Sequence, residues 1–355
     1  MSDKTSPQWL RTLTGLALTF ILAILAWLLT KTVYGISLPF GIPGKVLEYP
    51  IWAVLLGIVA NLFLRPFKAN EFIQPGVKTE LFLKTGLVLL GTGINLKLLV
   101  TAAGGAILQA VILITSVFFF TFWLAGRFGL DIKLRAVMST ALAVCGVSAA
   151  IAAAGAVVAK KEQVAYVIAI VILVALPLMV LAPLAASAMH LPDAVAGAWF
   201  GGNIDTTAAV VGAGTIYSNA AQQVASIVKS TQNVFIGLIA FLLAAYYASK
   251  TEGSQRPSAK LIWERFPKFV LGFILASILY TLGWIDGGKG TVLEAIKNWA
   301  FTLAFVSMGM EFAFGEIKKM GWRPVTVFLI ATLFNTILAL GTAWVIFKYL
   351  LPISL

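Results

Sequence analysis

Long apolar runs, separated by short polar, basic or Pro/Gly-rich connections, fill almost the whole chain. A membrane-spanning helix needs about 20 mostly apolar residues, and by that criterion the pattern predicts eleven spanning segments. They lie at residues 12–30, 50–64, 81–99, 106–125, 136–158, 164–184, 195–216, 222–249, 269–284, 299–314 and 324–350. Ten or twelve crossings stay open, because boundaries read from a pattern shift by several residues.

The stretch from Trp199 to Asn233 interrupts this apolar pattern with polar side chains at membrane depth. Its polar residues are Asn203, Asp205, Thr206, Thr207, Gln222, Gln223, Ser226, Lys229, Ser230 and Asn233. A carboxylate or ammonium at that depth costs at least ~2.5–3.5 kcal/mol. We interpret the stretch as half of a solute-binding site, and a polar helix–helix seam is the structural alternative.

Two subsets of these residues predict different roles. Gln222, Ser226, Lys229 or Ser230, and Asn233 recur every three to four positions, which places them on one helical face directed at protein or water. Asp205 and Lys229 lie on neighbouring segments. We expect them to pair across the intervening turn, either to couple transport to H⁺ or Na⁺ or as a purely structural salt bridge.

The hydrogen-bond donors of the stretch from Trp199 to Asn233 would suit a small oxyanion. We predict that Lys229 and the hydroxyl and amide groups bind it, together with backbone N–H groups freed where glycine interrupts a helix. The predicted solute-binding residues are Gly146, Ser148, Gly202, Asn203, Thr206, Thr207 and Lys229. The predicted ion-coupling residues are Asp205, Lys229 and Glu311.

Two weak internal similarities suggest repeats. Residues 89–95 resemble 305–311 at an offset of 216, which aligns Asn95 with Glu311, and 146–150 resemble 203–207 at an offset of 57. Secondary transporters are often built from inverted repeats with interrupted helices at the membrane midplane. We therefore expect segments 136–158 and 195–216 to be interrupted. Close packing of small residues is the alternative, and it suits the first of these segments nearly as well.

The distribution of Lys and Arg predicts the orientation. With the N-terminus in the cytoplasm, sixteen Lys/Arg fall in cytoplasmic connections and eight on the other side. Lys160 and Lys161 fit poorly, so either the bias tolerates them or segment 136–158 does not cross as a plain helix. We expect a single transporter domain over residues 1–355, with a cytoplasmic tail at 1–11 and a transmembrane region at 12–350.

Composition narrows the functional class. Of the 355 residues, 60% are hydrophobic and 11% charged, whereas soluble domains are about 25% charged. The net charge of +12 is explained by basic loops, so no nucleic-acid partner is expected. One cysteine, Cys145, excludes an intrachain disulfide. No metalloprotease, P-loop or serine-hydrolase motif occurs, so we predict no enzymatic activity and no ATP hydrolysis by this chain.

Four motifs carry a family resemblance that covers nearly the whole chain from about residue 15. They are C-G-V-S-A-A-I-A-A at 145–153, W-F-G-G-N-I-D-T-T-A-A-V-V-G-A-G at 199–214, I-V-K-S-T-Q-N at 227–233, and the segment ending at Met310. With them the chain resembles the YeiH-type sulfate exporter family of bacterial inner-membrane proteins. Many relatives have Arg after V-K-x-T, where this chain has Gln232, which removes one anion-binding charge.

The resemblance implies a fold related to bile-acid symporters and sodium/proton antiporters, with a panel, a core of crossed, broken helices and, by analogy, a homodimer. We therefore predict an all-α, multi-pass transporter of a small anion such as sulfate or a sulfonate. It would lie in a bacterial inner membrane with its N-terminus in the cytoplasm. Its partners would be the anion, membrane lipid and H⁺ or Na⁺, with no resident cofactor. A cation/proton antiporter, a passive anion channel and a membrane-embedded enzyme or sensor are the alternatives.

Overall fold

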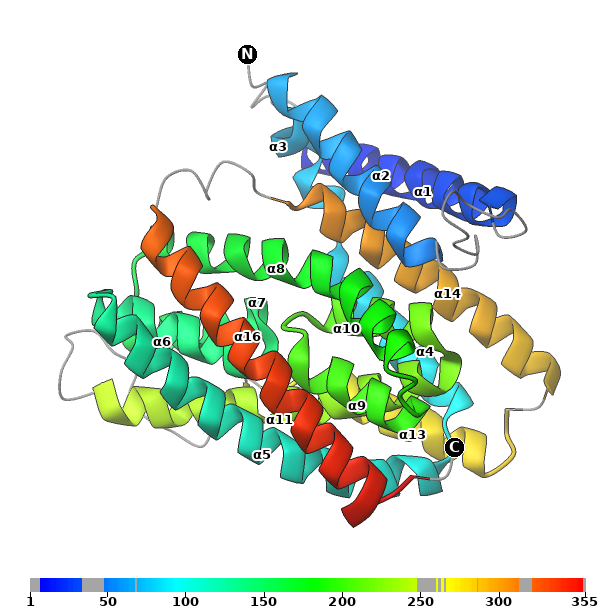
Figure 1. Ribbon diagram of the computed structural model, residues 1–355. Coiled ribbons are helices and arrows are strands. Elements are labelled where there is room, and N and C mark those ends of the chain that lie inside the picture. The colour runs from blue at the N-terminus through cyan, green and yellow to red at the C-terminus, as the bar shows by residue number, and fades with distance from the viewer. Residues whose placement is uncertain are drawn as a thin grey trace. The chain divides into compact units, whose positions relative to one another are not determined.

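Helices form every regular element in the described part of the chain (Figure 1), which comprises residues 7–33, 48–67, 69–247, 260, 263–264, 266–285, 287–312 and 321–353 of the computed structural model. The chain divides into two compact units. Unit 1 comprises Met1–Leu96 and Phe269–Phe312, and unit 2 comprises Lys97–Lys268 and Ala313–Leu355. The predicted cations Lys4, Lys45, Lys68, Lys250, Arg256, Arg265, Lys318 and Lys319 lie outside the described residues, as does part of the predicted tail.

Unit 1 consists of helices that approach one another closely at glycines. Its elements are α1 (Gln8–Val33), α2 (Tyr49–Leu64), η3 (Arg65–Phe67), α3 (Ala69–Ile73), η4 (Gln74–Gly76), α4 (Thr79–Leu90), η5 (Gly91–Gly93), α13 (Phe269–Thr281) and α14 (Gly287–Met310). A Cβ added to Gly57 of α2 would lie 2.2 Å from the Val306 carbonyl oxygen of α14. Small residues therefore let these two backbones meet, as is common between membrane helices.

Unit 2 combines long helices with short, broken ones. Its elements are α5 (Leu96–Arg127, starting at the last residue of unit 1), α6 (Ile132–Thr140), the π-helical turn η6 (Ala141–Cys145), α7 (Val147–Val157), α8 (Lys161–Ala188), α9 (Asp193–Asn203), α10 (Thr207–Tyr217), α11 (Asn219–Tyr247), α16 (Trp322–Val345) and η7 (Ile346–Leu350). The short helices α6, α7, α9 and α10 correspond to segments 136–158 and 195–216. The predicted interruptions are therefore present.

Segment 136–158 turns back on itself instead of crossing. The chain breaks at Gly146, whose φ of 54° and ψ of −105° suit a residue without Cβ. The two ends of the segment then meet: Lys133 Nζ donates to the Val158 carbonyl at 2.9 Å, and Gln163 Nε2 donates to Asp131 Oδ1 at 2.9 Å. We call residues 132–157 hairpin 1.

Segment 195–216 forms a second hairpin. It breaks over residues 204–206, between α9 and α10. At its base Ser218 Oγ donates to Asp193 Oδ1 at 2.6 Å, and the Tyr217 hydroxyl donates to the Leu191 carbonyl. We call residues 193–217 hairpin 2.

The two hairpins enter unit 2 from opposite ends and meet at their tips. Helix α8 connects the base of hairpin 1 to the base of hairpin 2, and its 28 residues extend about 42 Å, enough to span a bilayer. Figure 1 shows α6 and α7 towards one end of α8, and α9 and α10 towards the other. At the tips, a Cβ added to Gly146 would lie 3.2 Å from the Asp205 carbonyl oxygen.

These hairpins correct the predicted number of crossings. Among the described residues six helical stretches are long and apolar enough to span a membrane: 8–33, 49–67, 96–127, 161–188, 219–247 and 322–350. Eleven spanning helices is therefore more than the structure supports. Two of the predicted segments are long enough to cross but return to the end from which they started.

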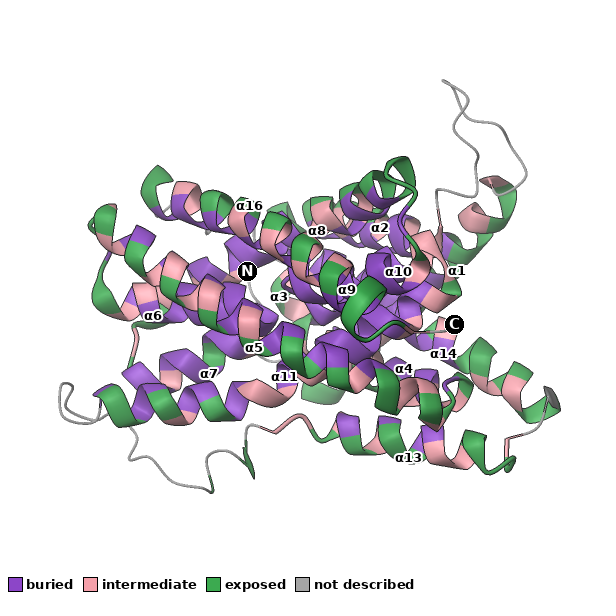
Figure 2. Cartoon of the chain, turned by 60° about the horizontal axis from the view of Figure 1, so that its bottom comes forward, coloured by how far each residue is buried: buried purple, intermediate pink, exposed green. Residues whose placement is uncertain are grey.

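The interior of unit 2 is formed by the hairpins and α11. In α9 every residue from Ala194 to Asn203 is buried, and Figure 2 shows the same concentration of burial on α10. Outward-facing apolar side chains such as Phe119 of α5 and Leu181 of α8 are largely exposed. This arrangement suits lipid outside and protein contacts around the hairpin tips.

Candidate functional site at the hairpin tips

The tip of hairpin 1 is held by two polar side chains of α11. The π-helical turn frees backbone carbonyls from the ordinary helical ladder. Lys229 Nζ donates to the Val144 carbonyl at 2.7 Å and to Gln232 Oε1 at 2.9 Å, while Gln232 Nε2 donates to the Ala143 carbonyl at 2.9 Å. Lys229 and Gln232 therefore fix this tip against α11.

The tip of hairpin 2 is held by α16. Asn335 Nδ2 donates to the carbonyls of Gly202, at 3.3 Å, and Asn203, at 3.1 Å. Thr336 Oγ1 donates to Asn203 Oδ1 at 2.8 Å. On the other side of the break, Thr206 Oγ1 caps α10 by accepting from the Ala209 N–H at 3.3 Å. The break of hairpin 2 is therefore held by α16, while its helix α10 also bonds α11, where Asn233 Nδ2 donates to Thr207 Oγ1 at 3.1 Å.

Two helices, α7 and α10, have their N-termini where the hairpin tips meet. Helix α7 starts after Gly146 without a side-chain cap, and α10 starts at Thr207. The Cys145 thiol lies within reach of the Ser148 and Thr207 hydroxyls. The free N–H groups and the dipole at such helix starts favour negative charge.

Several buried polar atoms near this point have no hydrogen-bond partner within the described part of the chain. They are Asn203 Nδ2, Asp205 Oδ2, Ser230 Oγ and Asn233 Oδ1, from residues that are at most 4% exposed. Leaving a buried polar group unpaired costs about 1–3 kcal/mol, more when it is charged. A bound solute, ion or water would pair them.

The predicted ion pair between Asp205 and Lys229 does not form. The salt bridges within the described ranges, at 80/84, 260/264 and 294/297, do not include it. The physical reason is that the Lys229 ammonium extends to the Val144 carbonyl of hairpin 1 and to Gln232 Oε1. Its charge stays in the same buried region as the Asp205 carboxylate, which is 2% exposed.

Two other predicted site residues have different surroundings. Glu311 follows α14 and belongs to unit 1, where its carboxylate lies near the Thr79 hydroxyl, whereas the other predicted residues belong to unit 2. A Cβ added to Gly202 would lie 2.6 Å from Leu113 Cδ1, so this glycine permits tight packing against α5. The predicted residues that lie at the two tips are Gly146, Ser148, Asn203, Asp205, Thr206, Thr207 and Lys229, of which Lys229 reaches them from α11.

The site residues that lie on α16 were not predicted from the sequence. Asn335 is 2% exposed, and with Thr336 it holds hairpin 2. The sequence signal for Asn335 was a side-chain amide in the mostly apolar segment 324–350. Polar side chains inside a membrane segment are rare and usually face protein. Gln109 of α5, which donates to the Ala198 carbonyl at 3.2 Å, carried the same signal.

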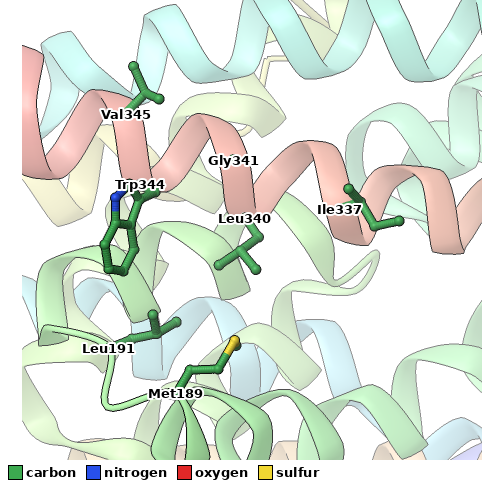
Figure 3. Close-up of a pocket in the computed structure, with 7 residues that line it drawn as sticks. All are labelled: Met189, Leu191, Ile337, Leu340, Gly341, Trp344 and Val345. Atoms are coloured by element: carbon green, nitrogen blue, oxygen red, sulfur yellow. The ribbon is translucent and has the colours of Figure 1, made fainter.

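A separate hollow of about 570 Å³ lies between the end of α8 and α16 (Figure 3). Met189 and Leu191 line one side, and Ile337, Leu340 and Trp344 line the other. No charged side chain lines it. Because an anion there would have no ionic partner, this hollow does not compete with the hairpin tips as the candidate site.

Comparison with known proteins identifies similar membrane proteins. The model of a family described as "Conserved hypothetical protein 698" matches residues 14–328. A UPF0324 membrane protein of Rhodopirellula baltica is 35% identical, covering 91% of this chain and 62% of its own length. One from Nitratidesulfovibrio vulgaris is also 35% identical, covering 85% and 55%, and one from Nitrosomonas europaea is 30% identical, covering 90% and 72%.

The chain therefore spans less than two thirds of the length of the first two of these relatives. The three names describe membrane proteins and do not mention sulfate. No solved structure matches.

Proposed function

The chain is a multi-pass membrane protein that belongs to the family described as conserved hypothetical protein 698, and on that premise we propose that it is a secondary active transporter of a small anion. One observation carries the proposal. Two re-entrant hairpins meet tip to tip, and the N-termini of α7 and α10 lie there with unpaired buried polar atoms.

Alternating access would use the different hydrogen bonds that hold the two tips. Lys229 and Gln232 bond the tip of hairpin 1, whereas Asn335 bonds the break of hairpin 2, so the bonds at one tip can open while those at the other persist. In this proposal, movement of one hairpin opens the site to one side of the membrane, while the other blocks the opposite side. A site at the midplane between interrupted helices is the usual arrangement in secondary transporters.

The anion would be a small oxyanion such as sulfate or a sulfonate. Lys229 supplies positive charge, the two helix starts supply N–H groups, and Ser148 and Thr207 supply hydroxyls. Asp205 would carry the coupling ion, H⁺ or Na⁺, because it is a buried carboxylate with an unpaired oxygen.

We test this function by reconstituting the protein in liposomes and following labelled sulfate and a labelled small alkanesulfonate under imposed Na⁺ and pH gradients. The wild-type protein should accumulate the anion against its gradient. Asp205→Asn should reduce this uphill accumulation at least tenfold, since the coupling charge is lost. Glu80→Gln removes an exposed carboxylate of unit 1 and should leave accumulation unchanged.

Other results would contradict the proposal in different ways. If the anion moves only down its own concentration gradient, whatever Na⁺ or pH gradient is imposed, the protein is a passive channel. Exchange of Na⁺ for H⁺ without anion movement indicates a cation/proton antiporter, a second candidate that the unpaired Asp205 carboxylate also favours. Full accumulation by Asp205→Asn removes Asp205 from the coupling role.

We also propose a cytoplasmic N-terminus. Because hairpin 1 turns back, Lys160 and Lys161 lie at the same end of unit 2 as Lys133. Assigning them to the cytoplasmic side changes the predicted distribution of Lys/Arg from sixteen against eight to eighteen against six. Lys160 and Lys161, which fitted a cytoplasmic N-terminus poorly when segment 136–158 was taken to cross, therefore support it.

Single-cysteine labelling tests this topology in a Cys145→Ala background. Cysteines at positions 127 and 161 should react with a membrane-impermeant thiol reagent in inside-out vesicles, and a cysteine at position 190 in right-side-out vesicles. Helix α8 separates 161 from 190, which is the physical reason for the contrast. Reaction of positions 127 and 161 from opposite sides would disprove the re-entrant arrangement of hairpin 1.

A further inference from the structure

We propose that Asp205, Ser230 and Asn233 form a binding site for a monovalent alkali-metal cation beside the anion site. Each contributes a buried side-chain oxygen without a hydrogen-bond partner: Asp205 Oδ2, Ser230 Oγ and Asn233 Oδ1. All three residues belong to unit 2, and they are 2%, 4% and 3% exposed.

The contacts place these oxygens in one region. Asn233 Nδ2 donates to Thr207 Oγ1 at 3.1 Å, which ties Asn233 to the residue two positions after Asp205. Ser230 lies one turn before Asn233, on the same face of α11. With the amide in this orientation, Nδ2 is paired and Oδ1 has no hydrogen-bond partner.

A cation accounts for this set of atoms better than a proton does. A proton on Asp205 would neutralise the carboxylate, but Asp205 Oδ2 has no hydrogen-bond partner that could accept it, so the Ser230 and Asn233 oxygens would stay unpaired. One metal ion can take oxygen ligands from a carboxylate, an amide and a hydroxyl together.

The charge of the site favours a monovalent ion. Asp205 is the single carboxylate in the set, and no cluster of three His, Cys, Asp or Glu occurs in the described part of the chain. Lys229, 1% exposed, contributes a positive charge to the same region. Sites for divalent ions usually combine several carboxylates, so a second positive charge on the ion would be poorly compensated here.

Cation binding would also change the charge offered to the anion, and this step rests on the proposed function. Without the cation, Asp205 offsets Lys229, and the two helix N-termini supply about half a positive charge each. With the cation bound, Asp205 is neutralised and Lys229 adds its full charge. The cation therefore raises anion affinity, and by linkage the anion raises cation affinity equally.

Thermal unfolding of the purified protein in NaCl or choline chloride of equal concentration tests the site without any transport. A cation that binds only the folded state raises the Tm with its concentration. We expect Na⁺ to raise the Tm by several degrees and choline to have no such effect. Asp205→Asn should abolish the Na⁺ effect, and Ser230→Ala should shift its midpoint to about tenfold higher Na⁺.

Ser226→Ala is the matched control. Ser226 lies one turn before Ser230 on α11 and is fully buried, but its Oγ donates to the Gln222 carbonyl at 2.7 Å. This variant should keep the wild-type Na⁺ midpoint. A Tm that does not respond to Na⁺, or responds only to pH, overturns the cation site, and so does an equal loss in Ser226→Ala and Ser230→Ala.

Anion transport and the cation site can be tested independently of each other. A Na⁺-dependent Tm without anion uptake in liposomes leaves the cation site standing and removes anion transport. Anion uptake that is indifferent to Na⁺, together with a Tm indifferent to Na⁺, removes the cation site and leaves the anion transporter.

Discussion

Gly146→Ala should destabilise unit 2 by about 3 kcal/mol and abolish transport. Gly146 has a φ of 54° and a ψ of −105°, a sparsely populated conformation that costs a residue with Cβ about 1–3 kcal/mol. The new Cβ would also lie 2.5 Å from Val171 Cγ1 and 3.2 Å from the Asp205 carbonyl oxygen. Such overpacking costs about 1–3 kcal/mol, and at this position it would force the two hairpin tips apart.

Thermal unfolding in detergent measures the destabilisation, and uptake into liposomes measures the loss of transport. Gly341→Ala on α16 is the control, since a Cβ there meets nothing within 4 Å and the helix conformation accepts it. That variant should match the wild-type Tm or exceed it slightly. A Tm for Gly146→Ala as high as that of Gly341→Ala would mean that the hairpin tips do not pack as described.

Lys229→Met should have the second large effect. Lys229 is 1% exposed, and its ammonium pairs with the Val144 carbonyl and Gln232 Oε1. Methionine keeps the apolar stem but leaves these acceptors unpaired and removes the positive charge near Asp205. We expect the Tm to fall by several degrees and anion affinity to fall about 100-fold, which corresponds to ~3 kcal/mol.

The matched control is Lys84→Met. Lys84 also lies in a helix and bonds Glu80 at 2.6 Å, but half of its side chain is exposed, so the pair contributes about 0–1 kcal/mol. Titration of the alkanesulfonate by the Tm shift gives anion affinity for both variants. Wild-type affinity in a folded Lys229→Met protein would reduce Lys229 to a structural support of hairpin 1.

Much of the candidate site could be predicted from the sequence because polar groups are expensive inside a membrane. Asp205, Thr207 and Lys229 stand out in an apolar chain for that reason, and the structure buries them together. The interruption near Gly146 was predictable too, because the glycine lies in a helix-length segment that resembles 203–207. These inferences need only local composition and spacing.

Other features depend on residues that are distant in the sequence. The segments 136–158 and 195–216 are each long enough to cross, and their composition does not separate a crossing helix from a hairpin. The contacts of Lys133 with Val158 and of Ser218 with Asp193 make that distinction. Asn335 reaches hairpin 2 across 132 positions of sequence, which no local pattern predicts.

The sequence by itself determined that this is an all-helical membrane protein with buried charges near residues 205 and 229, because the cost of placing polar groups in lipid acts on every position separately. The tertiary structure alone decided that two segments turn back and meet at their tips, and that Lys229 bonds the Val144 carbonyl of hairpin 1 while Asp205 keeps an unpaired oxygen. Those outcomes depend on which of several acceptors lies nearest after packing, and packing is a property of the whole unit.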